Sequence, residues 1–299
     1  MTLFFNMEFI TKSQIKIPKR NKSSHKGDNG MVLAVGGSKD YAGAITLAGL
    51  SALRSGCDLV KIIAPEKVAW AISAYSPDLV TKKIPSEFFS PKHAQIAREE
   101  IKKFDVLLIG NGIGLKDESR EFCKKSVKEI TKLKVIDADA IKSISMEDCK
   151  NSIITPHSKE LEYFLLNSKV NKNIIKKISL ERNFFAKAEL IKRTAQKFLD
   201  KNNIILLKGK IDIILSKDKT FFVRGGNAGM TRGGTGDVLA GLCAGFLAQS
   251  KDLLQSAINA SYFNKKIGDI LLKKKKGFTY LASDMAEEIK NIKYLKHKI

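Results

Sequence analysis

The chain has 299 residues, and 43% of them are hydrophobic, which is enough to bury a sizeable core. Lysine and arginine number 53 against 31 aspartate and glutamate, which gives a net charge of +22 at pH 7. The lysines are spread through every segment without the interleaved aromatic residues typical of RNA-binding sheets, so we expect no specific nucleic-acid partner.

Cysteine usage and apolar runs indicate the compartment. The four cysteines lie far apart, at spacings that do not suit a metal site, and are typical of free thiols in a reducing environment. Residues 1–14 lack the features of a signal peptide, and the apolar run near position 240 is too short to span a bilayer. We therefore expect a cytoplasmic protein without a membrane partner.

Short apolar runs alternate with segments of helical periodicity from residue 31 onward. MVLAVGG (31–37), a helical pattern over 42–56, and VKIIAP (60–65) form a strand, helix and strand, a βαβ unit with parallel strands. Further apolar strands are expected at 104–110, 133–137, 152–155 and 203–209, with helices at 118–130, 159–166 and 181–199. This alternation predicts an α/β fold with a mostly parallel sheet covered by helices on both faces.

The pattern changes after residue 210. Two apolar runs, 211–216 and 220–226, flank a short polar turn and predict a hairpin added at the sheet edge. Helices are expected over 236–249, 252–272 and 281–295. The lysine-rich stretch 167–179 has no clean period and is interpreted as a surface insertion. No linker divides the chain, so residues 1–299 are expected to form a single domain.

Small and polar loops follow the predicted strands, and all of them should lie at one edge of the sheet. The loops begin with GGSKDYAGA, GNGIG, DADA, TPH and KGK, and the hairpin is followed by GMTRGGTGDVLAG (229–241). Open α/β folds bind ligands at the carboxyl ends of their strands. Backbone amides, carboxylates and a lysine are the groups used in phosphoryl transfer. The chain has neither a P-loop nor a Rossmann fingerprint.

GMTRGGTGDVLAG places glycines and Asp237 at the start of a predicted helix. Glycines at a helix N-terminus let an anion approach unpaired N–H groups, so the motif is typical of a phosphate site. The alternative is a tight loop in which Asp237 only complements the helix dipole. The motif by itself leaves both open.

Several motifs together resemble the ATP/ADP-dependent NAD(P)H-hydrate dehydratases of the ribokinase-like superfamily. They are KGDNGMVLAVGGSKDYAGA, IGNGIGL, VIDADAI, ITPHSKE, LLKGKID and GGNAGMTRGGTGDVLAG, and the match covers residues 26 to 265. The resemblance implies a single ribokinase-like dehydratase domain over 1–299, without the separate N-terminal epimerase domain that many relatives carry.

The resemblance also implies a metabolite repair reaction. The substrate would be hydrated NADH or NADPH (NADHX or NADPHX), the cosubstrate ATP or ADP with Mg²⁺, and the 6-hydroxyl would be phosphorylated before phosphate is eliminated. The alternative is a small-molecule kinase of the same superfamily, such as a vitamin-precursor kinase, whose product keeps the phosphate. We also expect a homo-oligomer.

Site residues follow from the resemblance position by position. Asp237 would be the catalytic base and contact the substrate, and Glu160 would organise Mg²⁺ through water, unless it is only a helix-start carboxylate. His157 would contact the substrate, although a lone histidine is more often structural. Substrate contacts are Ala44, Gly112, His157 and Asp237, and nucleotide contacts are Lys208, Gly209, Lys210, Ile211, Asp212, Gly234, Thr235 and Gly236.

Three positions depart from the family pattern. Asn111 replaces a usual proline and should loosen its loop, while Asp212 replaces a common threonine and places a negative charge near the nucleotide. Arg232 replaces a small residue and offers a further phosphate contact. In DADA, Asp137 and Asp139 bound the pocket, or Asp139 caps the next helix.

Overall fold

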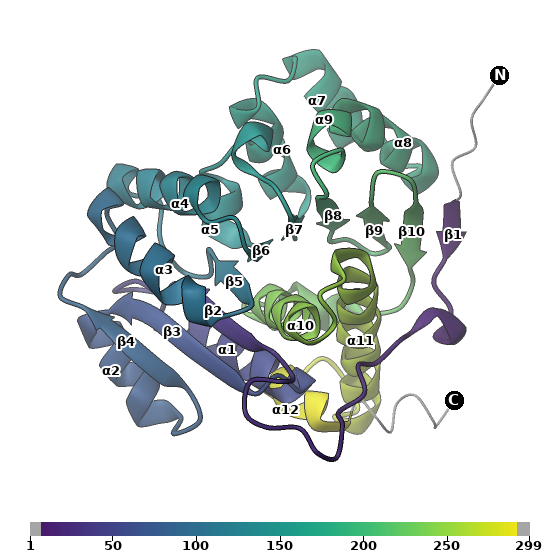
Figure 1. Ribbon diagram of the computed structural model, residues 1–299. Helices are drawn as coiled ribbons and strands as arrows, with labels where there is room; N and C mark the ends of the chain where they lie inside the picture. Colours follow the sequence, from purple (N-terminus) through teal and green to yellow (C-terminus); the bar gives the residue numbers. More distant parts are fainter. Residues whose placement is uncertain (1–6, 292–299) are drawn as a thin grey trace.

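The structure, a computed structural model, describes residues 7–291. Its described part contains one ten-stranded sheet in the order β1-β10-β9-β8-β7-β6-β5-β2-β3-β4 (Figure 1). The strands from β2 to β8 run parallel, and β9 is antiparallel to both β8 and β10, which confirms the mostly parallel sheet. The strands are β1 (Met7–Phe9), β2 (Met31–Val35), β3 (Leu59–Pro65), β4 (Val80–Ile84), β5 (Val106–Ile109), β6 (Leu133–Ile136), β7 (Ser152–Ile154), β8 (Ile204–Leu207), β9 (Asp212–Leu215) and β10 (Thr220–Val223).

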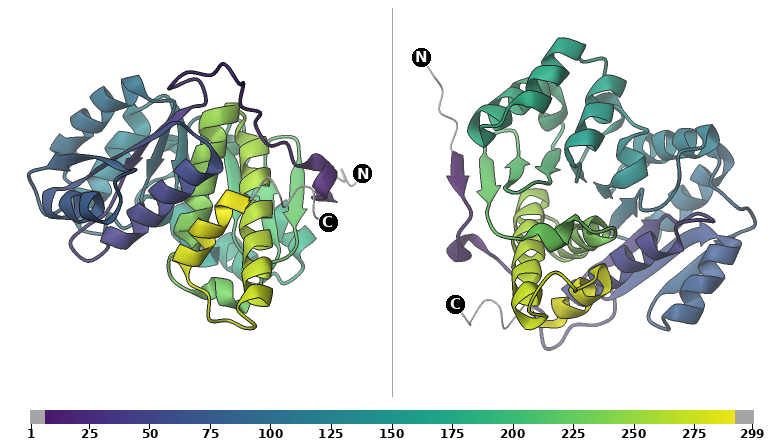
Figure 2. Two further views of the ribbon diagram at one scale, coloured as in Figure 1. Left: turned by 90° about the horizontal axis from the view of Figure 1, so that it is seen from below. Right: turned by 180° about the vertical axis from the view of Figure 1, so that it is seen from behind.

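Both faces of the sheet are buried, because the unbroken apolar strands send alternate side chains to opposite sides. In β2, Val32 and Ala34 join one core cluster, and Leu33 and Val35 join the other. Figure 2 shows the helices layered on both faces. They are α1 (Ala42–Ser55), α2 (Glu66–Tyr75), α3 (Ala94–Glu100), α4 (Asp117–Glu129), α5 (Ala138–Ile141), α6 (Ser158–Asn167), α7 (Lys172–Leu180), α8 (Phe184–Thr194), α9 (Gln196–Leu199), α10 (Thr235–Ser250), α11 (Leu253–Lys274) and α12 (Ala282–Glu288).

Helix α10 is buried along most of its length. It packs between α1, α11 and the strands β2, β5 and β6, and its residues from Val238 to Ala248 are all buried. This enclosure fixes its N-terminus, and with it Asp237, against the ends of the central strands. Within residues 7–291, no helix is both long and apolar enough to cross a membrane.

Three helix predictions differ from the structure. The stretch 167–179, interpreted as a surface insertion without a clean period, is mostly exposed, but it contains most of α7, which Asn171 caps and which buries Ile175 and Ile178. The single helix expected over 181–199 is two helices, because Asn183 caps the start of α8 and Ala195 leaves helical geometry before α9. The helix expected over 281–295 ends as α12, followed by a 3₁₀ turn at Ile289–Asn291, and 292–295 lie outside the described residues.

The edges of the sheet also correct the predictions. The β9–β10 hairpin is present, but β1 pairs parallel with β10 and therefore forms the edge itself. At the other edge, β4 and its preceding helix α2 were not predicted. The chain order of the strands reverses at β2, which lies between β3 and β5, so a topological switch point lies between β2 and β5. Such a point is where ligands bind in open α/β sheets.

Candidate active site at the carboxyl ends of the parallel strands

Side chains from four separate strand ends meet around Asp137. Asn111 follows β5, Asp137 follows β6, Thr155 follows β7 and Lys208 follows β8. The Asp137 carboxylate accepts hydrogen bonds from Thr155 Oγ1 at 2.7 Å, Asn111 Nδ2 at 2.9 Å and Lys208 Nζ at 3.1 Å. Asn111 Nδ2 also donates to Asp237 Oδ1 at 2.7 Å, which joins α10 to the network. The expectation that these loops share one edge is therefore confirmed.

Asp237 carries the most perturbed carboxyl group of this network. Burial raises its pKa from 3.8 to about 7, and the nearby charge of Asp137 adds to the rise. The hydrogen bond from Asn111 and the charge of Lys208 act in the opposite direction. A carboxylate with a pKa close to neutrality is suited to accept a proton from a hydroxyl group.

Lys208 is the cation of this cluster. Its side chain is 20% exposed, and its Nζ lies 3.1 Å from Asp137 Oδ1 and 3.5 Å from Glu160 Oε2. Burial by itself lowers the pKa of Lys208, but the charges of Asp137 and Glu160 outweigh it and raise the pKa overall. Lys208 therefore stays protonated and compensates two buried carboxylates.

The N-terminus of α10 is built to leave N–H groups free. Gly234 caps it with φ +93°, a left-handed conformation, and a Cβ there would come within 2.7 Å of Ala282 Cβ. Thr235 Oγ1 donates to the carbonyls of Met230 and Arg232 and holds the preceding turn. The N–H groups of Gly236 and Asp237 have no partner among residues 7–291. Unpaired N–H groups at a helix start favour an anion.

The other residues expected to contact the substrate come from the start of α1 and from the loops that follow β5 and β7. Gly112, with φ +69°, follows β5, and a Cβ there would lie 2.6 Å from the Tyr41 carbonyl and 3.2 Å from Ala44 Cβ. The start of α1 therefore lies directly against this loop. His157 caps α6 through Nδ1, which accepts from the N–H groups of Lys159 and Glu160, and half of its side chain remains exposed. Burial lowers its pKa.

The turn after β8, residues 208–212, is braced from inside. Asp212 and Lys265 form an ion pair at 3.2 Å, and each side chain is only 6% exposed. Asp212 Oδ1 also accepts from the N–H of Gly209, and Lys265 Nζ donates to the carbonyls of Gly209 and Lys210. Because Lys265 compensates the charge of Asp212, this aspartate is a brace for the turn. Gly209 and Lys210 are exposed, and Ile211 is half-buried.

The carboxylates of the network do not by themselves form a complete protein site for a metal ion. Among residues 7–291, no group of three or more His, Cys, Asp or Glu side chains could hold a metal ion. Glu160 Oε2 accepts from the N–H of His157 and faces Lys208, so its charge is already engaged. An indirect role for Glu160 toward Mg²⁺ remains a prediction.

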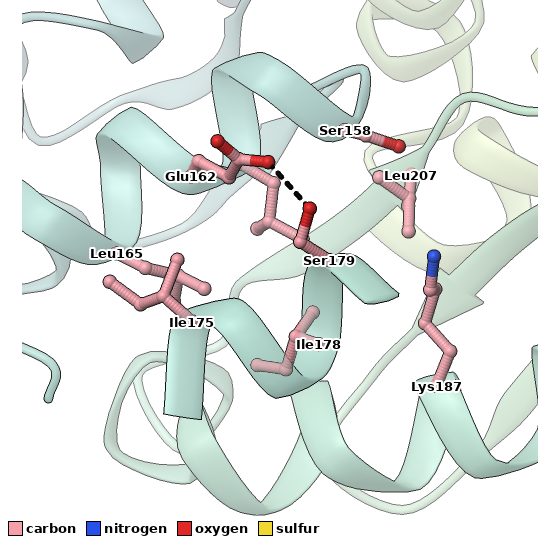
Figure 3. Close-up of a pocket in the computed structure, with 9 residues that line it drawn as sticks. Ser158, Glu162, Leu165, Ile175, Ile178, Ser179, Lys187 and Leu207 are labelled. Atoms are coloured by element: carbon pink, nitrogen blue, oxygen red, sulfur yellow. Dashed lines mark hydrogen bonds between the residues drawn. The ribbon is translucent and has the colours of Figure 1, made fainter. Parts of the chain in front are cut away.

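Two cavities of the described structure lie away from the acidic network. A crevice of about 10 Å³ between α6, α7 and α8 holds no more than one water, and Ser179 Oγ donates across it to Glu162 Oε1 at 2.8 Å (Figure 3). A hollow of about 520 Å³ lies at the amino end of β8, beside Asn203 and Ser216. Neither is lined by Asp137 or Asp237.

The contacts of two side chains in this region were not recognised from the sequence. Asn111 was expected to loosen its loop, whereas its amide bridges Asp137 and Asp237. Its place after a strand, at the edge of Asp137, is a signal that could have suggested this contact. Lys265 lies in α11, and nothing in its local sequence points to Asp212.

A family model described as NAD(P)H-hydrate dehydratase matches residues 32–291. The chain belongs to this family. The chain spans about half the length of the first curated relatives it matches: the bifunctional NAD(P)H-hydrate repair enzyme Nnr of Methanocaldococcus jannaschii is 37% identical over 277 residues, which cover 92% of this chain and 50% of that protein. The ADP-dependent (S)-NAD(P)H-hydrate dehydratase of Cenarchaeum symbiosum is 32% identical, with 92% of each chain covered.

Solved structures agree with this dehydratase family and with the ribokinase-like fold. A ribokinase-like superfamily protein from Enterococcus faecalis is 25% identical with a TM-score of 0.80, and 99% of each chain is covered. The ADP/ATP-dependent NAD(P)H-hydrate dehydratase from Bacillus subtilis, co-crystallised with ATP and Mg²⁺, is 25% identical with a TM-score of 0.78, over 99% of this chain and all of that one. The fold and family expected from the sequence motifs are confirmed.

Proposed function

We propose that this chain converts hydrated NADH and NADPH back to NADH and NADPH, with ADP or ATP as the phosphoryl donor. The observation that carries the proposal is the position of Asp237. A carboxylate with a pKa of about 7 lies at a helix N-terminus whose N–H groups are free to bind a phosphoryl group. The names of the relatives support the choice of substrate and nucleotide.

In the first step, the 6-hydroxyl oxygen of the hydrated ring attacks the terminal phosphorus of the nucleotide. Its proton passes to Asp237, and the bond between the terminal phosphorus and the bridging oxygen breaks. The leaving group is AMP when ADP is the donor and ADP when ATP is the donor. The N–H groups of Gly236 and Asp237 stabilise negative charge on the transferring group. Lys208 keeps Asp137 and Glu160 compensated, which prevents their charges from raising the pKa of Asp237 further.

In the second step, the lone pair of the ring nitrogen forms a double bond to C6 while the C6–O bond breaks and releases phosphate. Loss of a proton from C5 then restores the ring double bond. Ala44 and Gly112, which lie against each other, offer a flat wall without long side chains for the ring. His157, whose side chain is half exposed, is proposed as a further contact.

The nucleotide is proposed to lie along the exposed turn of Gly209 and Lys210, with its phosphates at Gly234 to Gly236. Mg²⁺ is proposed to arrive with the nucleotide phosphates, because Lys208 already compensates the carboxylates of the chain. The co-crystallisation of the Bacillus subtilis relative with ATP and Mg²⁺ is consistent with this route.

The test combines two products in one assay. The protein is mixed with Mg²⁺, ADP or ATP, and hydrated NADH, and both NADH absorbance and free phosphate are followed. The proposal expects both to appear in equal amounts. A phosphorylated product without free phosphate would instead identify a small-molecule kinase.

A further inference from the structure

Asn111 lies between the two carboxylates with both amide protons in use. Its Nδ2 donates to Asp137 Oδ2 at 2.9 Å and to Asp237 Oδ1 at 2.7 Å, and the residue is fully buried. Asp237 Oδ2 has no hydrogen-bond partner among residues 7–291. One oxygen of Asp237 is therefore held by the amide, and the other is free.

The orientation of this amide is fixed by the two carboxylates. Asn111 Oδ1 is buried and has no partner in the described structure, which is uncommon for a buried polar atom. Rotating the amide by half a turn would place this oxygen against two carboxylate oxygens that can only accept. The unpaired Oδ1 is tolerated because both donors are committed to Asp137 and Asp237.

Asn111 is itself held in place from two sides. Its carbonyl accepts from the N–H of Gly37 at 2.9 Å, which ties its loop to the end of β2. Asp137 is in turn fixed by Thr155 and Lys208. Rigid groups on both sides leave Asn111 little freedom, so the position of its Nδ2 determines where Asp237 Oδ1 lies.

We infer that Asn111 is a positioning residue that holds Oδ1 of Asp237, so that Oδ2 is the oxygen that receives the proton of the substrate hydroxyl. The inference rests on the proposed function for the identity of that hydroxyl. Without the amide, two carboxylates face each other, and their repulsion disfavours the charged form of Asp237. Removing Asn111 therefore makes Asp237 both less well placed and harder to deprotonate.

The test compares Asn111→Leu, which has a similar shape but no donor, with the wild type in the pH dependence of kcat. We expect the midpoint of the acid limb to rise by about one pH unit, the size typical of losing a hydrogen bond to a carboxylate, and kcat on the plateau to fall about tenfold. Asn111→Ala carries the same prediction without added bulk in case the leucine does not fit.

Asn203→Ala is the matched control. Asn203 is also fully buried and makes three hydrogen bonds, with Ser152, Cys149 and Phe198. It lies at the amino end of β8, whereas Asn111 lies at the carboxyl end of β5. Its loss should lower the melting temperature and leave the acid limb in place. An acid limb of Asn111→Leu and Asn111→Ala that coincides with that of the wild type, with only a lower melting temperature, would overturn the inference.

A second measurement does not depend on activity. In protein labelled with ¹³C at aspartate carboxyl carbons, the Asp237 signal is assigned by its loss in Asp237→Asn and is titrated with pH. The inference expects its pKa to rise by about one unit in Asn111→Leu, and an unchanged pKa would contradict it. Failure of the wild type to recover NADH would refute the proposed function, while this titration would still decide the role of Asn111.

Discussion

The ammonium group of Lys208 lies 3.1 Å from the carboxylate of Asp137, across the ends of β8 and β6 with β7 between them. The same ammonium group lies 3.5 Å from Glu160 on α6. One cation therefore connects three elements of the site and compensates two carboxylates that are almost fully buried. This relationship makes Lys208 a structural counterion of the cluster before any ligand is considered.

Replacement of Lys208 by methionine should therefore destabilise the fold. Breaking a buried ion pair leaves uncompensated charge, and we expect Lys208→Met to lower the free energy of unfolding by about 3 kcal/mol in urea titrations at pH 7. Lys210→Met is the control, since Lys210 is exposed, and it should change stability by less than about 0.5 kcal/mol. Equal stability of the two variants would show that Lys208 does not stabilise the fold as the counterion of Asp137 and Glu160.

The family resemblance makes a separate prediction for ligand binding by Lys208→Ala. Lys208 matches the nucleotide segment, so this variant should lose more affinity for ADP or ATP than for the hydrated dinucleotide. Titration of each ligand into the folded variant measures both affinities. Equal losses would contradict the assignment of Lys208 to the nucleotide and leave it only its role in the cluster.

Asp212 and Lys265 are expected to behave as a coupled pair. Burial raises the pKa of Asp212 and the charge of Lys265 lowers it, so each residue depends on the other. Lys265→Met should lower the free energy of unfolding by about 3 kcal/mol, because it leaves Asp212 buried without a partner. Adding Asp212→Thr should recover part of this loss. A double-mutant cycle measures the coupling, and strictly additive losses would show that the pair is not coupled.

The sequence was sufficient to predict which loops meet, but not which side chains touch. Unbroken apolar strands imply a parallel sheet, and its topology brings the residues after β5, β6, β7 and β8 to one edge. The contact between Lys208 and Asp137 joins residues 71 positions apart, and it depends on side-chain directions that no local pattern encodes.

The predictions that differ from the structure have physical causes of a similar kind. In α7, only Ile175 and Ile178 are buried, so the apolar signal is too weak to stand out in a lysine-rich stretch. The end of α8 is set by the backbone conformation of Ala195, a residue that favours helix by itself. For Asn111, the family pattern indicated only the loss of a proline, and it carries no information on a partner as distant as Asp237.

The pH dependence of activity follows from the raised pKa of Asp237. A base must be deprotonated to accept a proton, so kcat should fall as pH decreases through about 7, the pKa of this carboxyl. The acid limb is measured between pH 5 and 9 at saturating substrates, with the assay for NADH recovery. A kcat that stays level down to pH 5, as expected for a carboxyl group with the ordinary aspartate pKa of 3.8, would mean that Asp237 is not the base.

Asp237→Asn separates the catalytic role of this residue from a purely structural one. The amide keeps the shape and an oxygen for the hydrogen bond from Asn111, but it cannot accept a proton. If Asp237 is the base, kcat should fall by about 10²–10⁴-fold while nucleotide binding persists. If it only complements the helix dipole, kcat should stay near normal and stability should drop by about 0.3–1 kcal/mol.

The pH dependence of the stability of Asp237→Asn is a second test of the raised pKa of Asp237. Asp237 has a pKa of about 7 in the folded chain against an ordinary value of 3.8, so folding takes up a proton between these values and the wild type loses stability as pH rises from about 4 to 7. The amide has no such dependence. Asp237→Asn should therefore be more stable than the wild type at pH 8, by about 2–4 kcal/mol, and this advantage should vanish by pH 4.

Urea unfolding of both proteins at the two pH values measures the difference. A buried carboxylate that serves as the base costs stability when it is charged, so its replacement by the amide should stabilise the fold at pH 8. If Asp237→Asn is instead less stable at pH 8 and still active, Asp237 only complements the dipole of α10.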